Sequence, residues 1–324
     1  MKYLLLCMKQ RQLARSVFTF MSMTLLATSV LFAQSKDTKG PPKPQEITLS
    51  SLGGWPISIT YYESSNAADS PVVVLLHGKA GSKRVWDQKF APTLQQNGFA
   101  VVSVDLRKHG KSQAAAATAG GSKNQKSRSK NRLSSLDYKA MVVDMETIWK
   151  FLFKEHQAKH LNMQKTAIVA SDISVPVALN YALIDWSKLP YDDAPVLAAK
   201  TPKGQTIRAM VLISPESSVP GLSSTRPTVQ LKSPLFGISF FVCSAQGDSL
   251  DRGTSKKLFT QLSSVPNSEQ RMFSKEFPGK LRGTDMLGRR LGIELEIIKF
   301  LDVFLKKLPG DWADRRNRLD RDDE

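Results

Sequence analysis

Cysteine is scarce in this chain, because its 324 residues include only two, Cys7 and Cys243. Cys7 lies in an N-terminal segment with the features of a signal peptide, so a mature protein would keep one cysteine. One cysteine cannot form an intramolecular disulfide, and the fold must therefore be stabilised by its hydrophobic core. Cys243 lies in an apolar run, which favours a packing role over a reactive one.

Histidine is also scarce and unevenly placed. All four histidines, His77, His109, His156 and His160, come before residue 161. The rest of the chain therefore offers no imidazole that could act as a general base. His156 and His160 have the four-residue spacing of a metal-binding pair, but no third ligand is nearby in the sequence. We interpret them as part of a solvated helix face, and we predict neither a metal site nor a cofactor.

Acidic residues are fewer than basic ones, 29 against 46, and the formal net charge is +17 at pH 7. Residues 1–33 hold four basic residues and no acidic ones, so 17 minus 4 leaves +13 for the remainder. That excess favours attraction to an acidic cell-envelope surface. The hydrophobic fraction of 41% is typical of globular proteins and excludes disorder of the chain as a whole.

Residues 1–33 have the layout of a secretory signal peptide. Basic residues precede an uncharged apolar run from Val17 to Ala33, and cleavage is expected after Ser29 or Ala33. The alternative is an uncleaved anchor, for which the run is barely long enough. We expect an exported protein, periplasmic or extracellular, with a Pro/Lys-rich linker at 34–44 and no multi-pass membrane topology.

Residues 113–135 contain many basic residues but no acidic and no aromatic ones. This composition predicts a flexible, solvated loop. The loop is expected to attract acidic envelope polymers or lipid headgroups. Specific nucleic-acid binding is not expected, since no aromatic side chain is present for base stacking.

Apolar runs of strand length alternate with helical periodicity over residues 45–308, which predicts an α/β domain with a mostly parallel sheet flanked by helices. The predicted strands are 55–62, 71–76, 99–104, 167–170, 208–213 and 237–243, and the predicted helices are 82–97, 134–155, 251–262 and 287–305. Residues 309–324 form a charged C-terminal tail, expected to fray from residue 311.

Polar residues follow several predicted strands: His77, Asp105, Asp172 and Asp248. The carboxyl ends of parallel strands meet at one edge of the sheet, so these side chains are expected to share a rim. Three motifs occur in order: His77-Gly78 after a strand, Asp105-Leu-Arg-Lys-His109-Gly-Lys-Ser, and a strand–turn–helix with Asp172 at its apex. Together they resemble the α/β-hydrolase superfamily, in particular its serine-hydrolase and monoacylglycerol-lipase-like branch, over residues 45–308.

The resemblance implies a role for each of the matched positions. Asp172 occupies the position of the nucleophile, Asp248 that of the acid, and Arg282 that of the histidine. The backbone N–H groups of Lys79 and Ile173 would form the oxyanion hole. His77, Gly78, Asp105 and His109 would belong to the loops of the family motifs.

Arg282 decides the functional interpretation. A guanidinium keeps its proton at any accessible pH, so Arg282 cannot be a general base. We predict that it contacts Asp172, Asp248 or both. Members of the superfamily with an aspartate nucleophile carry a helical cap after the strand that corresponds to 208–213. Here only about twenty residues separate that strand from the next one, 237–243, so no helical cap is expected.

Three functional hypotheses follow. The first is a catalytically degenerate hydrolase with a binding or structural role in the envelope. The second is an active hydrolase, acting on ester or related bonds, with Asp172 as nucleophile. The third is a polyanion-binding protein that uses residues 113–135 and is compatible with the first.

Overall fold

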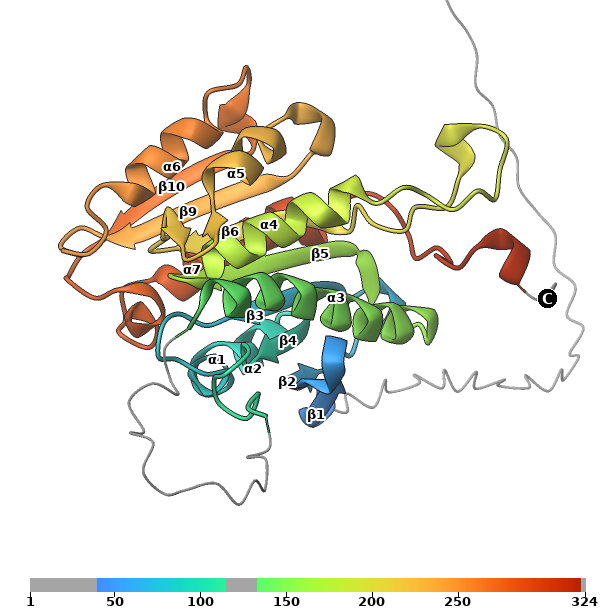
Figure 1. Cartoon of the computed structure of the whole chain (residues 1–324), viewed down its shortest axis with the longest axis horizontal. Coiled ribbons are helices and arrows are strands. Elements are labelled where there is room, and N and C mark those ends of the chain that lie inside the picture. The colour runs from blue at the N-terminus through green and yellow to red at the C-terminus, as the bar shows by residue number, and fades with distance from the viewer. Residues whose placement is uncertain (1–39, 115–132, 322–324) are drawn as a thin grey trace, which may run out of the picture. The chain divides into compact units, whose positions relative to one another are not determined.

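The computed structural model describes residues 40–114 and 133–321 (Figure 1). The predicted signal peptide at 1–33, the linker up to residue 39 and the basic segment from 115 to 132 lie outside these described residues. The predictions made for them therefore stay predictions.

An eight-stranded sheet forms the centre of the described domain, with the order β1-β2-β4-β3-β5-β6-β9-β10. Neighbouring strands from β4 to β10 run parallel, whereas β2 pairs antiparallel with both β1 and β4. The strands are β1 (Gln45–Ser50), β2 (Pro56–Tyr62), β3 (Pro71–Leu76), β4 (Ala100–Val104), β5 (Asn162–Ser171), β6 (Ile207–Ile213), β9 (Ser239–Ala245) and β10 (Met272–Phe277). The predicted, mostly parallel sheet is confirmed.

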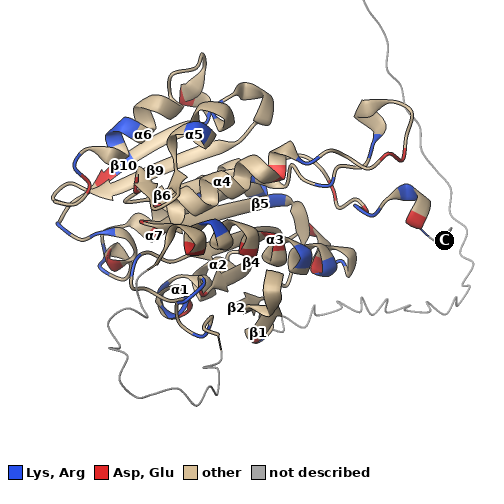
Figure 2. Cartoon of the chain, in the orientation of Figure 1, with Lys and Arg blue, Asp and Glu red and all other residues tan. Residues whose placement is uncertain are grey.

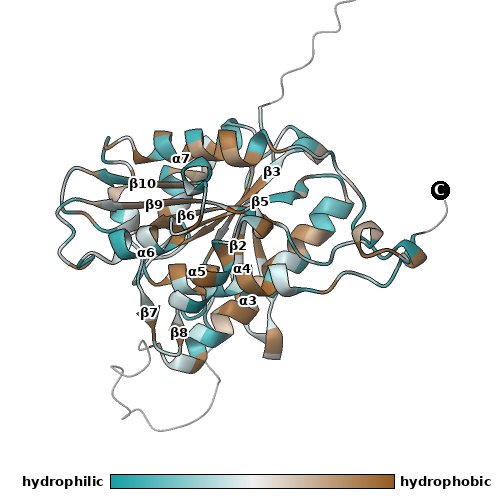
Figure 3. Ribbon diagram, turned by 90° about the horizontal axis from the view of Figure 1, so that it is seen from above, coloured by the Kyte–Doolittle hydropathy of each residue, from teal (hydrophilic) through white to brown (hydrophobic). Residues whose placement is uncertain are grey.

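Helices cover both faces of the sheet (Figure 3). One face packs against α3 (Ser135–Gln157), α4 (Ser174–Ser187), α5 (Thr225–Leu231) and α6 (Thr254–Leu262). The other packs against α1 (Arg84–Lys89), α2 (Ala91–Gln96) and α7 (Ile293–Leu301). Between β6 and β9, the hairpin of β7 (Ser218–Val219) and β8 (Leu222–Ser223) precedes α5, which packs against α4 and α6.

Strand β3 illustrates why the sequence folds in this way. All six of its residues are buried, and Val72 and Val74 face one core while Val73 and Leu75 face the other. A strand covered on both faces needs apolar residues at every position, because successive side chains point to opposite sides. Charged residues lie mostly on helices and loops, and β3, β4 and β9 carry none (Figure 2).

Several predicted boundaries need correction. The helix predicted over 82–97 is two short helices that meet at Phe90, since Pro92 in the first turn of α2 has no N–H to continue the preceding helix. The helix predicted from residue 287 begins only at Ile293, because Gly288 and Gly292 have positive φ angles of 71° and 80°. By contrast, α3 begins as expected, with Ser134 and Asp137 forming a capping box.

The expectation that residues from 311 onward fray is wrong for the described part of the tail. Trp312 donates from Nε1 to the carbonyl of His156 at 2.7 Å, and Arg315 is 4% exposed and donates to the carbonyls of Pro202 and Gly204. The prediction that His156 lies on a solvated helix face is also wrong, since the residue is fully buried. Its ring nitrogens contact the carbonyls of Leu161 and Ala313. The tail thus covers the end of α3. Its high content of charged residues predicted fraying, but Trp312 and Arg315 hold it against the domain.

The tail contact should contribute to stability. We expect Trp312→Ala to lower the free energy of unfolding by about 2 kcal/mol, since it removes ring packing and one hydrogen bond. Trp312→Phe keeps a ring and should cost about 1 kcal/mol. Urea titration followed by circular dichroism measures both. An unchanged midpoint for Trp312→Ala would show that the tail does not stabilise the domain.

Candidate functional site

The turn between β5 and α4 places Asp172 at its apex. Asp172 has a positive φ of 56°, which is unusual for a residue with a side chain and marks a tight turn. Ser174 stabilises the turn, because its hydroxyl accepts from the N–H of Ser171 at 2.9 Å and donates to the carbonyl of Ser171 at 2.8 Å. Gly78 packs against the turn at Asp172. A Cβ at Gly78 would come within 3.1 Å of the Asp172 Cβ, so the close approach favours glycine there. The elbow predicted from the sequence is present, with Asp172 8% exposed.

Both carboxylate oxygens of Asp172 are engaged. Oδ2 accepts from the backbone N–H of Lys79 at 3.0 Å. Oδ1 accepts from two groups of Arg282, Nε at 3.2 Å and Nη2 at 3.0 Å. Such charge-assisted hydrogen bonds are stronger than neutral ones, and several on one carboxylate fix its orientation.

Arg282 bridges Asp172 to two further carboxylates. Its Nη1 donates to Asp248 Oδ2 at 2.9 Å, and its Nη2 donates to Glu216 Oε1 at 2.8 Å. The Asp248 side chain is 2% exposed, and its other oxygen accepts from the N–H of Leu250 at 3.0 Å. The predicted contact of Arg282 with the aspartates is confirmed for both of them. We call Arg282, Asp172, Asp248 and Glu216 the arginine cluster.

Sequence reasoning missed Glu216. This residue follows β6 by three positions, as Asp248 follows β9, and the rule that site residues follow parallel strands would have found it. It lies in a Ser-Pro-Glu-Ser stretch that carries no family motif, so no resemblance pointed to it. The arrowheads of β9 and β10 point toward the edge of the sheet where these loops lie (Figure 1).

Charge balance sets the protonation of the cluster. Burial opposes the charge of Arg282, but the hydrogen bond and charge of Asp172, followed by the charges of Asp248 and Glu216, raise the pKa of its guanidinium above the ordinary value. Burial raises the pKa of Glu216, Arg282 acts in the opposite direction, and Asp172 raises it further. The guanidinium therefore stays cationic and cannot accept a proton.

Neither nearby histidine is hydrogen-bonded to Asp172 in the described structure. His77 accepts the N–H of Leu106 at its Nε2, 3.1 Å away, and its Nδ1 contacts the carbonyl of Gly78 at 2.8 Å. These contacts fix a neutral ring with the proton on Nδ1, and burial lowers the pKa of His77 to about 3. His109 packs edge-on against His77, with ring centres 4.9 Å apart, and its Nδ1 contacts the Arg107 carbonyl at 2.9 Å.

Asp105 connects two loops beneath the rim. It is 1% exposed, and its carboxylate accepts from the N–H of Lys83 at 2.7 Å and from that of Lys111 at 2.9 Å. Gly110 approaches so closely that a Cβ there would lie 2.2 Å from Asp105 Oδ1, and its φ of 48° also requires glycine. Asp105 therefore acts structurally on the loop that contains His109.

One of the two N–H groups that the resemblance assigns to an oxyanion hole is already engaged by Asp172. The resemblance assigned the N–H groups of Lys79 and Ile173 as its donors, and the Lys79 N–H donates to Asp172 Oδ2. If Lys79 has the role that the resemblance implies, its N–H is not free to bind an oxyanion while this contact persists. An open cavity of about 910 Å³ lies next to this contact, lined by Lys79, Asp172, Glu216, Arg252, Arg282 and Asp285 among others.

The remaining described residues suggest no metal centre or membrane span. No group of three or more His, Cys, Asp or Glu side chains among them is arranged to hold a metal ion. Among the helices of residues 40–114 and 133–321, none is long and apolar enough to cross a bilayer. Cys243 is 1% exposed, and burial raises the pKa of its thiol, which agrees with a packing role.

Comparison with known proteins is consistent with this architecture. A family model described as alpha/beta hydrolase fold matches residues 71–184. An esterase of Pyrococcus furiosus has a TM-score of 0.53 at 14% identity, over 81% of this chain and 91% of that one. A dienelactone hydrolase of Anabaena variabilis has a TM-score of 0.50 at 14% identity, over 82% of this chain and 100% of that one. A carboxyl esterase of Bacillus coagulans has a TM-score of 0.55 at 13% identity, over 81% of this chain and 99% of that one. No curated protein matches the sequence.

With the strand order and helical layers described above, these findings show that the chain has the α/β-hydrolase fold. At 13% and 14% identity, the likeness to these enzymes establishes the fold alone.

Removing the shared cation should destabilise the domain. Arg282→Met leaves three neighbouring carboxylates without their counterion, and we expect a loss of about 3–5 kcal/mol in the free energy of unfolding. Arg282→Met combined with Asp248→Asn should recover part of that loss, because one buried negative charge is removed. The measurement is urea denaturation at pH 7, with Arg289→Met as the exposed-arginine control. Equal stability of Arg282→Met and the control would refute the ionic account.

The buried neutral His77 predicts a pH dependence. The unfolded ring binds a proton below its ordinary pKa of 6.5, whereas the folded ring resists protonation down to about 3. Stability is therefore lost as pH falls from 6.5 toward 3, with a slope of at most about 1.4 kcal/mol per pH unit from this residue. His77→Gln should show a shallower decline than the natural protein over that range. Parallel curves would contradict the assignment.

Proposed function

We propose that this protein is a catalytically inactive α/β-hydrolase-fold protein with a binding or structural role in the cell envelope. The observation that supports the proposal most strongly is the position of Arg282, whose guanidinium bridges Asp172, Asp248 and Glu216 where the resemblance places a histidine. Hydrolysis through a covalent intermediate needs a group that accepts a proton from water, and a permanent cation cannot do so.

The state of Asp172 adds a second argument. Oδ1 of Asp172 accepts two hydrogen bonds from Arg282, which engage both of its lone pairs, and Oδ2 accepts one from the N–H of Lys79. Bonding to a cation and to a backbone N–H stabilises the charged carboxylate and makes it a weaker nucleophile. Both neighbouring histidines already contact backbone carbonyls through Nδ1.

An active hydrolase with Asp172 as nucleophile is the alternative. It would require a base at the position that Arg282 occupies, and the neighbouring Glu216 carboxylate is itself paired with Arg282. Loss of the base in comparable sites costs roughly 10⁴-fold to 10⁶-fold in rate. The fold by itself does not favour activity, because folds host many unrelated functions.

The envelope location rests on the sequence. Basic residues followed by the apolar run Val17 to Ala33 support export, and the basic segment 113–135 supports attraction to acidic polymers or lipid headgroups. Residues 1–39 and 115–132 lie outside the described structure, so this part of the proposal has no structural support.

Turnover of short-chain p-nitrophenyl esters tests the proposal. We expect the natural protein to match both Asp172→Ala and buffer, since Arg282 stands where the resemblance places the base. Asp172→Ser combined with Arg282→His places a nucleophile at the elbow and a base in the loop after β10, and this variant should gain measurable turnover. Asp285→Ala, an exposed carboxylate that lines the same cavity, serves as the matched control.

The opposite result would be turnover by the natural protein that Asp172→Ala abolishes and Asp285→Ala leaves unchanged. That pattern would identify Asp172 as a nucleophile and refute the proposal that the protein is catalytically inactive.

A further inference from the structure

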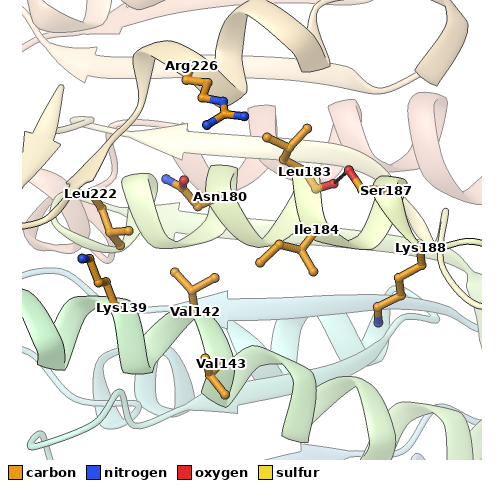
Figure 4. Close-up of a pocket in the computed structure, with 10 residues that line it drawn as sticks. All are labelled: Lys139, Val142, Val143, Asn180, Leu183, Ile184, Ser187, Lys188, Leu222 and Arg226. Atoms are coloured by element: carbon orange, nitrogen blue, oxygen red, sulfur yellow. Dashed lines mark hydrogen bonds between the residues drawn. The ribbon is translucent and has the colours of Figure 1, made fainter.

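A second concave surface lies away from the arginine cluster, between α3 and α4. It is an open groove of about 610 Å³, bordered at one end by the β7–β8 hairpin and along one side by α5 (Figure 4). Asn180 from α4 and Leu222 from β8 lie at that end of the groove. None of its lining residues belongs to the arginine cluster, so its role is independent of the chemistry at Asp172.

The centre of the groove is apolar. Val142 and Val143 approach from α3, and Leu183 and Ile184 from α4 (Figure 4). Val143 is 43% exposed and Ile184 is 47% exposed, although both lie in the middle of well-formed helices. Leu136, near the start of α3 and outside the residues that line the groove, is 73% exposed. Exposed apolar side chains that line one groove favour a binding surface.

Positive charge surrounds the apolar centre. Lys139 and Arg226 are exposed on opposite sides of the groove, one from α3 and the other from α5 (Figure 4). Within the described residues neither forms an ion pair. Lys188, at the far end, pairs with Glu146 at 2.7 Å and lies 4.2 Å from the Trp149 ring centre. The described residues that line the groove include no Asp or Glu.

We propose that this groove binds an amphipathic helix of a partner protein, with an apolar stripe on one face and acidic side chains on both sides of the stripe. A channel between two helices accepts a third helix by the ridge-and-groove packing that joins helices in general. The unpaired cations on opposite sides match a helix whose acidic residues flank its apolar stripe.

Fluorescence anisotropy with a defined probe tests this inference. The probe is a fluorescein-labelled peptide of about 18 residues, roughly five helical turns, with leucines spaced three and four apart and flanked by glutamates. Matched peptides carry lysines in place of the glutamates, or the same residues in scrambled order. We expect the glutamate peptide to bind with a Kd of about 10–100 µM and the other two to bind at least about tenfold more weakly.

Two variants locate the binding surface. Val143→Glu with Ile184→Glu should weaken the glutamate peptide at least about tenfold, because it places negative charge in the apolar centre. Lys139→Glu with Arg226→Glu should weaken the glutamate peptide and strengthen the lysine peptide by similar factors. Leu235→Glu, at a residue 90% exposed outside the groove, and Lys257→Glu with Arg289→Glu are the controls and should bind normally. Circular dichroism confirms that each variant is folded.

Absence of saturable binding up to about 1 mM, or equal binding by the Val143/Ile184 double variant, would overturn the inference. A parallel sedimentation assay uses vesicles of phosphatidylcholine with phosphatidylglycerol. Vesicle binding that the same double variant abolishes, without peptide binding, would assign the groove to a lipid surface instead and would also overturn it.

Discussion

The guanidinium of Arg282 is the interaction on which the rim of this domain depends. Three carboxylates that follow different strands, Asp172 after β5, Glu216 after β6 and Asp248 after β9, meet around it. Without the cation, three neighbouring negative charges would repel one another in a half-buried setting. Arg282 therefore both permits these carboxylates to lie together and fixes the loop that follows β10. The same bonds engage the carboxylate of Asp172, which occupies the position that the resemblance assigns to a nucleophile.

The geometry of a hydrolase elbow is retained in spite of this. The apex keeps its positive φ, Gly78 keeps its close approach, and the N–H of Lys79 points to the apex side chain. These features depend on backbone conformation and on the absence of a Cβ at Gly78, and the identity of the apex side chain has little effect on them. A fold shared with esterases and a dienelactone hydrolase is therefore compatible with a site of different chemistry. We propose the α3–α4 groove as a binding surface of the domain.

The sequence predicted what depends on continuous patterns. Apolar runs identified β3 and β6 within a residue of their ends, because strands covered on both faces need uniform hydrophobicity. It did not predict β10, whose Ser274, Lys275 and Glu276 are exposed at the edge of the sheet, nor the ordered tail, which a few anchoring contacts hold in place. Arg282, Asp172 and Asp248 were found through family spacing. Glu216 was not, since it matches no family motif, although it follows β6 by three positions as Asp248 follows β9.

Asp172 is an ion-pair partner of Arg282, and we propose that it does not act as a nucleophile. Isotope incorporation tests this most directly. The protein is incubated in ¹⁸O-labelled water with a panel of carboxylic esters and an epoxide. After proteolysis, the mass of the peptide that contains Asp172 is measured by mass spectrometry. A nucleophilic carboxylate acquires label when water hydrolyses its covalent intermediate at the carboxyl carbon. The account predicts no label above that in Asp285 of the same sample. Substrate-dependent labelling of Asp172 alone would contradict it.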